Sequence, residues 1–248
     1  MAIGALATAA LCALALAGCG DAGAAPRPKV PILVYHHVGD PPRGERNPSL
    51  YVTPQRFRAQ IRALRAAGFH AVTLARVWAA WHHGATLPTR PVVLSFDDGF
   101  AEQDTIARPT LSALRWPGTL NLQLDRLDAR GGLSRAAIAR MRRDGWEIDD
   151  HTTTHPDLTR VSARRLRAEV AGSRAAIRRA LGVDPRFFCY PYGRTNAAVR
   201  RAVAAAGFKA ATTIRPGLAT ARQDRLALPR IVVRRTMRPA EVARLASG

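Results

Sequence analysis

Short apolar runs alternate with amphipathic helical patterns along this 248-residue chain, and this alternation is the feature that most constrains its fold. From Val30 onward, runs such as "VPILVY" and "PVVLSF" are separated by segments in which apolar residues recur at helical spacing. Parallel strands need crossover connections long enough to hold a helix, so this order is typical of a parallel sheet. The sequence therefore predicts an α/β fold.

The number of apolar runs favours a barrel over an open sheet. About seven or eight strands can be counted between residues 30 and 248, and no Pro/Gly-rich break divides them. Helices are predicted to begin after Thr53 and Ser134, with a long arginine-rich helix from Ser162 and another from Thr195. We expect a single domain whose functional site lies at the carboxyl ends of the strands.

The first residues, "MAIGALATAALCALALAGC", are uncharged and rich in Ala and Leu, which predicts an export signal over residues 1–18. The "LAGC" at its end resembles the lipobox of bacterial lipoproteins and implies a lipidated Cys19. Residues 19–29 would then be a flexible tether. We expect a cell-membrane lipoprotein facing the extracellular side, with plain secretion as the alternative.

The net charge of +20 comes almost entirely from arginine. Affinity for acidic wall polymers or anionic lipid headgroups is one interpretation. A compositional bias that places arginines on solvated helix faces is the other, and the charge alone leaves both open. We expect no nucleic-acid partner, because the chain is predicted to be exported and lacks aromatic residues interleaved with basic ones.

Two clusters of polar residues follow predicted strands. "SFDDGF" places Asp97 and Asp98 after one apolar run, and "HTTTH" places His151 and His155 four residues apart after another. Two imidazoles with a carboxylate suit Zn²⁺ or a similar divalent ion and leave coordination positions open. A buried histidine pair without a metal is the alternative.

Three motifs together, "SFDDG", "HTTTH" and "YPYG", resemble the successive motifs of the polysaccharide deacetylase family, carbohydrate esterase family 4 with the NodB homology domain. The resemblance covers residues 30–248. It implies a distorted (β/α) barrel of about seven strands, in agreement with the strand count above. It also implies a metal-dependent hydrolase that removes acetyl groups from a polysaccharide.

The resemblance assigns roles to individual residues. Asp98, His151 and His155 would bind the divalent ion, for which Zn²⁺ is expected, with Co²⁺ and Ni²⁺ as alternatives. Asp97 would be the general base, and the backbone N–H of Tyr192 would donate to the oxyanion that forms on the acetyl group. A carboxylate beside a metal site is suited to accept a proton from water.

One departure from the family pattern concerns the general base. Most members carry an arginine two residues before the proline of the third motif, and Cys189 stands there instead. Arg230, in "LPRIVV", is predicted at the start of a strand. We hypothesise that Arg230 reaches Asp97 from that strand.

A second departure concerns the general acid. The family usually supplies it from a Leu-x-x-His motif near the C-terminus, yet no histidine follows His155. The same spacing occurs from Leu33 to His36, and the first and last strands of a closed barrel are neighbours. We predict His36 as the acid, with His37 as the second candidate.

The start "VPILVYHHV" resembles deacetylases of poly-β-1,6-N-acetylglucosamine. The sequence thus predicts N-deacetylation of an extracellular N-acetylglucosamine polysaccharide, with release of acetate. Peptidoglycan, chitin oligomers and acetylxylan are alternative substrates, and a carbohydrate-binding pseudoenzyme is an alternative of another class. The expected partners are the N-acetylated polysaccharide and the membrane, through Cys19, and we expect a monomer.

Overall fold

The computed structural model describes residue 1 and residues 27–248, and its centre is an eight-stranded parallel sheet. Hydrogen-bonded neighbours follow the order β7-β6-β5-β4-β3-β1-β8, while the short β2 pairs with β3. The strands are β1 (Ile32–Tyr35), β2 (His70–Ala71), β3 (Pro91–Asp98), β4 (Thr119–Leu122), β5 (Glu147–Asp150), β6 (Phe187–Cys189), β7 (Ala210–Thr212) and β8 (Ile231–Val232).

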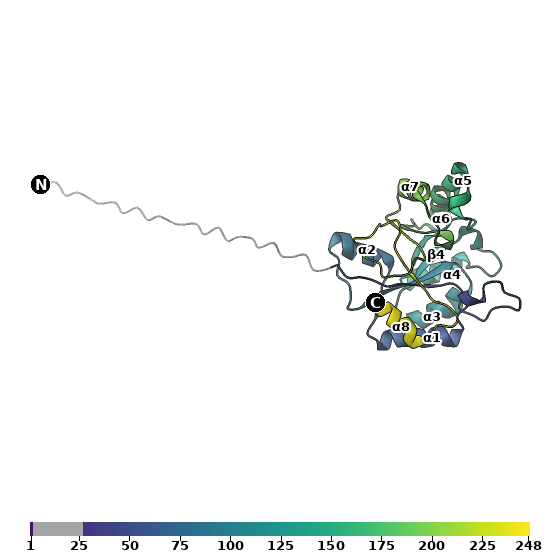
Figure 1. The fold of residues 1–248 in the computed structure, drawn as a ribbon, viewed down its shortest axis with the longest axis horizontal. Coiled ribbons are helices and arrows are strands. Elements are labelled where there is room, and N and C mark those ends of the chain that lie inside the picture. The colour runs from purple at the N-terminus through teal and green to yellow at the C-terminus, as the bar shows by residue number, and fades with distance from the viewer. Residues whose placement is uncertain (2–26) are drawn as a thin grey trace.

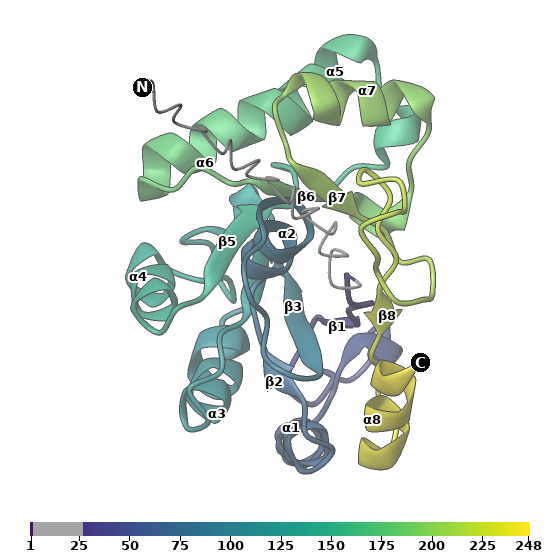
Figure 2. The same ribbon diagram turned by 90° about the vertical axis from the view of Figure 1, so that its left-hand side faces the viewer.

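The helices mostly surround this sheet on its outer side (Figure 1, Figure 2). They are α1 (Pro54–Ala66), α2 (Leu74–His83), α3 (Arg108–Ser112), α4 (Arg135–Arg143), α5 (Ala163–Arg167), α6 (Ser173–Leu181), α7 (Ala197–Ala205) and α8 (Pro239–Ser247). Helix α2 instead lies over the centre of the ring of strands in Figure 2. The C-terminal helix α8 packs against α1, so the last helix of the chain lies beside the first one.

One helical prediction is confirmed and one needs correction. The long helix predicted from Ser162 begins there, and a π-helical turn at Ala168–Gly172 lies within it, between α5 and α6. The helix expected from Thr195 begins one residue later, because the Asn196 side chain accepts the Val199 N–H as the N-cap at 2.9 Å. Asparagine is the stronger N-cap of the two residue types.

The sheet closes into a barrel through the segment 228–232. Its first part pairs with the end of β7, where Leu228 N–H donates to Ala211 O and Thr213 N–H donates to Leu228 O, each at 2.9 Å. Just beyond β7, Arg230 N–H donates to Arg215 O at 3.0 Å. Its second part, β8, pairs in parallel with β1. One segment therefore joins the two ends of the sheet, and the predicted distorted (β/α) barrel in a single domain is confirmed.

The central strands alternate between an apolar and a polar face. Leu94, Phe96, Leu120, Leu122 and Ile148 pack in one core cluster with side chains of α1, α3, α4 and α8.

Polar residues occupy the intervening positions, which point to the opposite, inner face. The register places Ser95 beside Thr119 and Asp97 beside Asn121. The barrel interior is thus polar around Asp97.

Among the described residues, no helix has the length and apolar character needed to cross a membrane. The predicted signal and Cys19 lie outside the described residues.

A second buried acidic pair lies on β5. Glu147 accepts a hydrogen bond from the Ala75 N–H near the start of α2 at 3.0 Å, while its other oxygen is buried without a partner. Asp149 accepts from the Phe187 N–H at 3.1 Å, and one of its oxygens is also unpartnered. Burial raises the pKa of Glu147 from 4.5 to about 7, and burial followed by the Glu147 charge raises the pKa of Asp149.

This pair predicts a pH-dependent stability. A raised folded-state pKa means that ionisation of Glu147 destabilises the fold, increasingly from its unfolded value of 4.5 to the folded value near 7. Glu147→Gln should therefore raise the thermal unfolding midpoint relative to wild type more at pH 8 than at pH 5, measured by circular dichroism. Glu241→Gln, at a capping carboxylate in the first turn of α8, is the control. Parallel midpoint curves for wild type and Glu147→Gln would contradict the prediction.

Candidate active site

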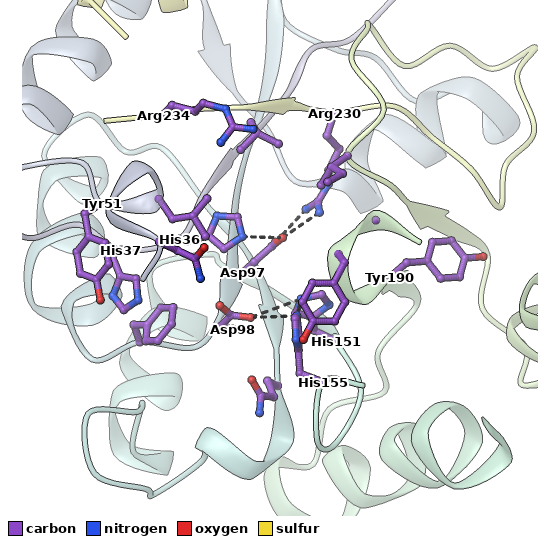
Figure 3. A pocket seen from close by; sticks show the side chains of 18 of the residues that line it. His36, His37, Tyr51, Asp97, Asp98, His151, His155, Tyr190, Arg230 and Arg234 are labelled. Atoms are coloured by element: carbon purple, nitrogen blue, oxygen red, sulfur yellow. Dashed lines mark hydrogen bonds and ion pairs between the residues drawn. The ribbon is translucent and has the colours of Figure 1, made fainter. Parts of the chain in front are cut away.

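A cavity of about 880 Å³ lies at the carboxyl ends of the strands. Its lining includes all seven predicted site residues, which come from five separate segments of the chain: His36, Asp97, Asp98, His151, His155, Tyr192 and Arg230. Figure 3 labels all of them except Tyr192. These residues lie far apart in the sequence but close together in the fold, because the parallel sheet brings the carboxyl ends of its strands to one edge.

Arg230 and Asp97 form an ion pair inside the barrel (Figure 3). The two guanidinium NH₂ groups donate to the two Asp97 oxygens at 2.9 Å each, and both side chains are almost fully buried. Asn121 Nδ2 donates to Asp97 Oδ1 at 2.7 Å, and Arg230 Nε donates to the Thr213 carbonyl at 2.8 Å. Arg230 therefore reaches Asp97 from the barrel-closing segment.

This ion pair determines the charge of Asp97. Burial alone would raise the pKa of Asp97, but the Arg230 guanidinium, followed by His151 and His36, holds that pKa well below its usual range. Asp97 is thus ionised near neutral pH, and an ionised carboxylate is the form that can accept a proton.

Cys189 occupies the position where an arginine was expected from the family pattern. Its Sγ lies 3.1 Å from an Arg230 nitrogen and 3.5 Å from Asp97 Oδ2, and the side chain is buried. The smaller cysteine leaves room for the Arg230 guanidinium to approach Asp97 from the other side of the barrel. Arg230 thus gives Asp97 the guanidinium contact that an arginine at position 189 would have given it.

Asp98, His151 and His155 converge on one point (Figure 3). Asp98 Oδ1 lies 3.5 Å from His151 Nε2 and 3.7 Å from His155 Nε2, and the two Nε2 atoms are 3.1 Å apart. Asp98 Oδ1 is buried and has no hydrogen-bond partner.

The donor set fits a divalent cation. His151 Nδ1 lies 2.7 Å from the Cys189 carbonyl oxygen and must donate to it, which leaves Nε2 free to act as a ligand. Two imidazole nitrogens and an orphaned carboxylate oxygen at one point are a known ligand combination for Zn²⁺ and related ions. These three residues are therefore the ones that could hold a metal.

The two imidazoles differ in their affinity for a proton. Burial lowers the pKa of His151, but Cys189 and the Asp97 and Asp98 carboxylates outweigh it and raise that pKa to about 10. Burial and then the charge of His151 lower the pKa of His155 to about 4. A proton therefore binds to His151 in preference to His155.

A second group of side chains, Asp97, His151 and Cys189, also has ligand atoms within 4.8 Å of one another. The Arg230 guanidinium already pairs with both Asp97 oxygens, and the His151 Nδ1 is used by the Cys189 carbonyl. This group is consequently a poor cation site.

His36 and His37 have different surroundings. His36 Nε2 lies 3.9 Å from Asp97 Oδ2, and burial is the largest cause of its lowered pKa. His37 is stacked between Tyr51 and Phe100, at ring-centroid distances of 3.9 and 3.5 Å, and its Nδ1 lies 2.6 Å from a Glu102 oxygen. His36 is thus next to the predicted base, while His37 belongs to the wall of the cavity.

Tyr192 adopts a left-handed backbone conformation, with φ of 58° and ψ of 10°. The hydrogen bonds of this turn use the N–H groups of Gly193 and Arg194. A side chain at Gly193 would collide with Ile214, because a Cβ there would lie 2.4 Å from Ile214 Cγ1. The tight "YPYG" turn therefore depends on this glycine, and Tyr192 within it lines the cavity.

The polysaccharide deacetylase family model matches residues 84–211, about half of the chain, which include the Asp-Asp and His-x-x-x-His motifs. The chain belongs to the polysaccharide deacetylase family. It is a deacetylase that acts on a polysaccharide, and the resemblance stated from the sequence is confirmed.

Individual relatives agree with this assignment. The Streptococcus pyogenes deacetylase PplD, solved with acetate, is 26% identical, with a TM-score of 0.82 over 89% of this chain and 99% of that one. YxkH of Bacillus subtilis, which its name assigns only provisionally to the polysaccharide deacetylases, is 24% identical over 205 residues, 83% of this chain and 71% of YxkH.

The poly-β-1,6-N-acetyl-D-glucosamine N-deacetylase of Escherichia coli K12 is 35% identical over 85 residues. This segment is 34% of this chain and only 12% of the relative.

Sequence reasoning missed Asn121, which donates to Asp97 from β4. A signal was present, because "TLNL" places an asparagine between two leucines that face the helices. An inward-facing polar residue in a barrel strand next to the strand of the base could have been recognised as its partner.

The geometry predicts different effects for the two adjacent histidines. His36→Ala should lower kcat by about 10²–10⁴-fold, since it removes the predicted general acid, and bound metal should be unchanged. His37→Ala, the matched control, should cost much less because its ring packs in the wall. Steady-state acetate release and metal analysis measure both effects. Near wild-type turnover in His36→Ala would overturn its assignment as the acid.

Proposed function

We propose that this deacetylase removes N-acetyl groups from an extracellular polysaccharide of β-1,6-linked N-acetylglucosamine by metal-dependent hydrolysis. One observation carries the proposal. The Asp97–Arg230 ion pair and the Asp98–His151–His155 cluster line the same cavity. The Escherichia coli relative supports the choice of polymer, because its name specifies this polysaccharide.

Asp98, His151 and His155 would hold the metal, for which we propose Zn²⁺. A divalent ion bound there would supply a Lewis acid for the acetyl carbonyl and for a water molecule. The chain itself provides the proton transfers. Asp97 would accept a proton from the attacking water, and its position beside Arg230 keeps it ionised before that step.

The remaining residues act on the acetyl group and the leaving nitrogen. The Tyr192 N–H would donate to the carbonyl oxygen as negative charge develops there. His36, next to Asp97, would deliver a proton to the amide nitrogen as the C–N bond breaks. Water and the N-acetyl group are thereby converted into acetate and a free amine.

The pseudoenzyme alternative rested largely on the missing family arginine. Arg230 makes a two-point contact with Asp97, so the base has a guanidinium partner after all. This contact favours turnover over simple carbohydrate binding.

We further propose that the protein works outside the cell. The predicted signal over residues 1–18 and the lipobox-like "LAGC" support export and a lipid anchor on Cys19. Residues 19–29 would then connect the anchor to the barrel.

A panel of substrates tests the choice of polymer. The protein should release acetate from β-1,6-linked N-acetylglucosamine oligomers with a kcat/KM at least about tenfold above that for chitin oligomers, because discrimination of this size needs only about 1.4 kcal/mol. Peptidoglycan fragments and acetylxylan complete the panel, and chelator-treated protein is the control. Faster turnover of any other member would replace the proposed substrate with that polymer.

A further inference from the structure

Two buried side chains outside the predicted site, Gln103 and Glu169, contact the backbone that carries it. Gln103 is fully buried and Glu169 is 4% exposed. Each belongs to a π-helical turn, at Gln103–Ala107 and Ala168–Gly172. Such turns are rare and are found frequently at functional sites.

Gln103 joins the two strands that carry the acid and the base. Its Nε2 donates to the His36 carbonyl at 3.0 Å and to the Asp97 carbonyl at 2.7 Å. His36 directly follows β1, and Asp97 lies near the end of β3, which pairs with β1. A single amide thus fixes the separation of these two backbones where their side chains enter the cavity.

Glu169 holds the loop that carries the two histidines. Its Oε2 accepts from the Thr153 N–H at 3.0 Å and from the Thr154 N–H at 2.9 Å, and its Oε1 accepts from the Thr154 hydroxyl. These two threonines lie between His151 and His155.

The loop needs such support because its backbone is strained. Thr152 has a φ of 67° and His155 a φ of 58°, in the left-handed region that residues with a side chain rarely adopt. Each such residue costs roughly 1–3 kcal/mol and persists only where surrounding contacts hold it. The hydrogen bonds of Glu169 lie between these two positions.

We propose that Gln103 and Glu169 are positioning residues for separate halves of the proposed chemistry. Gln103 sets the distance between His36 and Asp97, and Glu169 sets the orientation of His151 and His155 toward a metal. The π-helical turns orient both side chains. The extra residue in each turn changes the direction in which neighbouring side chains point, compared with a regular α-helix. The inference rests on the proposed function.

The test measures kcat and Zn²⁺ affinity in two variants of the full protein, and each variant should change one quantity and leave the other unchanged. Gln103→Met keeps the side-chain length but removes the two donors, and it should lower kcat at least about tenfold while Zn²⁺ affinity stays unchanged. Glu169→Gln should weaken Zn²⁺ binding by about 10–100-fold, measured against a chromophoric chelator, with kcat at saturating Zn²⁺ within a few-fold of wild type.

Matched controls separate positioning from stability. Gln60 is also a buried amide that donates to a backbone carbonyl, that of Met237 at 3.0 Å, but it lies on α1 away from the cavity. Gln60→Met and Glu147→Gln should alter thermal unfolding without changing kcat or Zn²⁺ affinity.

Milder variants replace any that fail to fold. Gln103→Asn keeps the amide but is too short to reach both carbonyls. Thr154→Ala removes the hydroxyl contacts to Glu169 and Arg165 but keeps the backbone N–H that donates to Glu169.

The outcomes separate this inference from the proposed function. Unchanged kcat in Gln103→Met together with unchanged Zn²⁺ affinity in Glu169→Gln would overturn the positioning roles. A wild-type protein that neither binds Zn²⁺ nor releases acetate would overturn the proposed function instead. In that case, crystal structures of the two variants still decide the inference, since it requires a changed His36–Asp97 separation in one and a displaced histidine loop in the other.

Discussion

The buried ion pair between Arg230 and Asp97 is the interaction on which the rest of the site depends. A carboxylate in the barrel interior is costly unless opposite charge and hydrogen bonds compensate it. Arg230 and Asn121 together engage both Asp97 oxygens, and Thr213 accepts from the remaining Arg230 donor. Arg230 can do this because the segment 228–232 joins β7 to β1, so closure of the barrel also brings in the cation that keeps Asp97 ionised.

Backbone strain is concentrated around the same cavity. Asp98, Thr152, His155 and Tyr192 are all non-glycine residues with positive φ, and three of them are predicted site residues. Residues in such conformations are held there by their surroundings. The site is therefore a set of strained turns at strand ends, supported by a regular sheet and by buried polar side chains.

Much of this arrangement could be predicted from the sequence. The alternation of apolar runs and helical patterns indicated the barrel, and the motifs after predicted strands indicated which residues share its open end. Arg230 was inferred from its place at a strand start, and the structure places its guanidinium on Asp97.

The supporting residues could not be predicted in the same way. Gln103 and Glu169 act from π-helical turns, and helical periodicity contains no signal for one inserted residue. The π-helical turn between α5 and α6 is an example, because the sequence pattern from Ser162 is that of a regular, continuous α-helix. Asn121 donates across strands, and its partner depends on a register that the sequence does not specify.

The most direct test of the central claim is to measure bound metal and acetate release for wild type and Asp97→Asn on β-1,6-linked N-acetylglucosamine oligomers. The account predicts about one divalent ion per chain in both proteins. It also predicts a loss of turnover of about 10²–10⁴-fold in the variant, because Asp97 is proposed to accept the proton and not to hold the metal. Retained turnover in Asp97→Asn, or a wild-type protein that binds no metal, would contradict it.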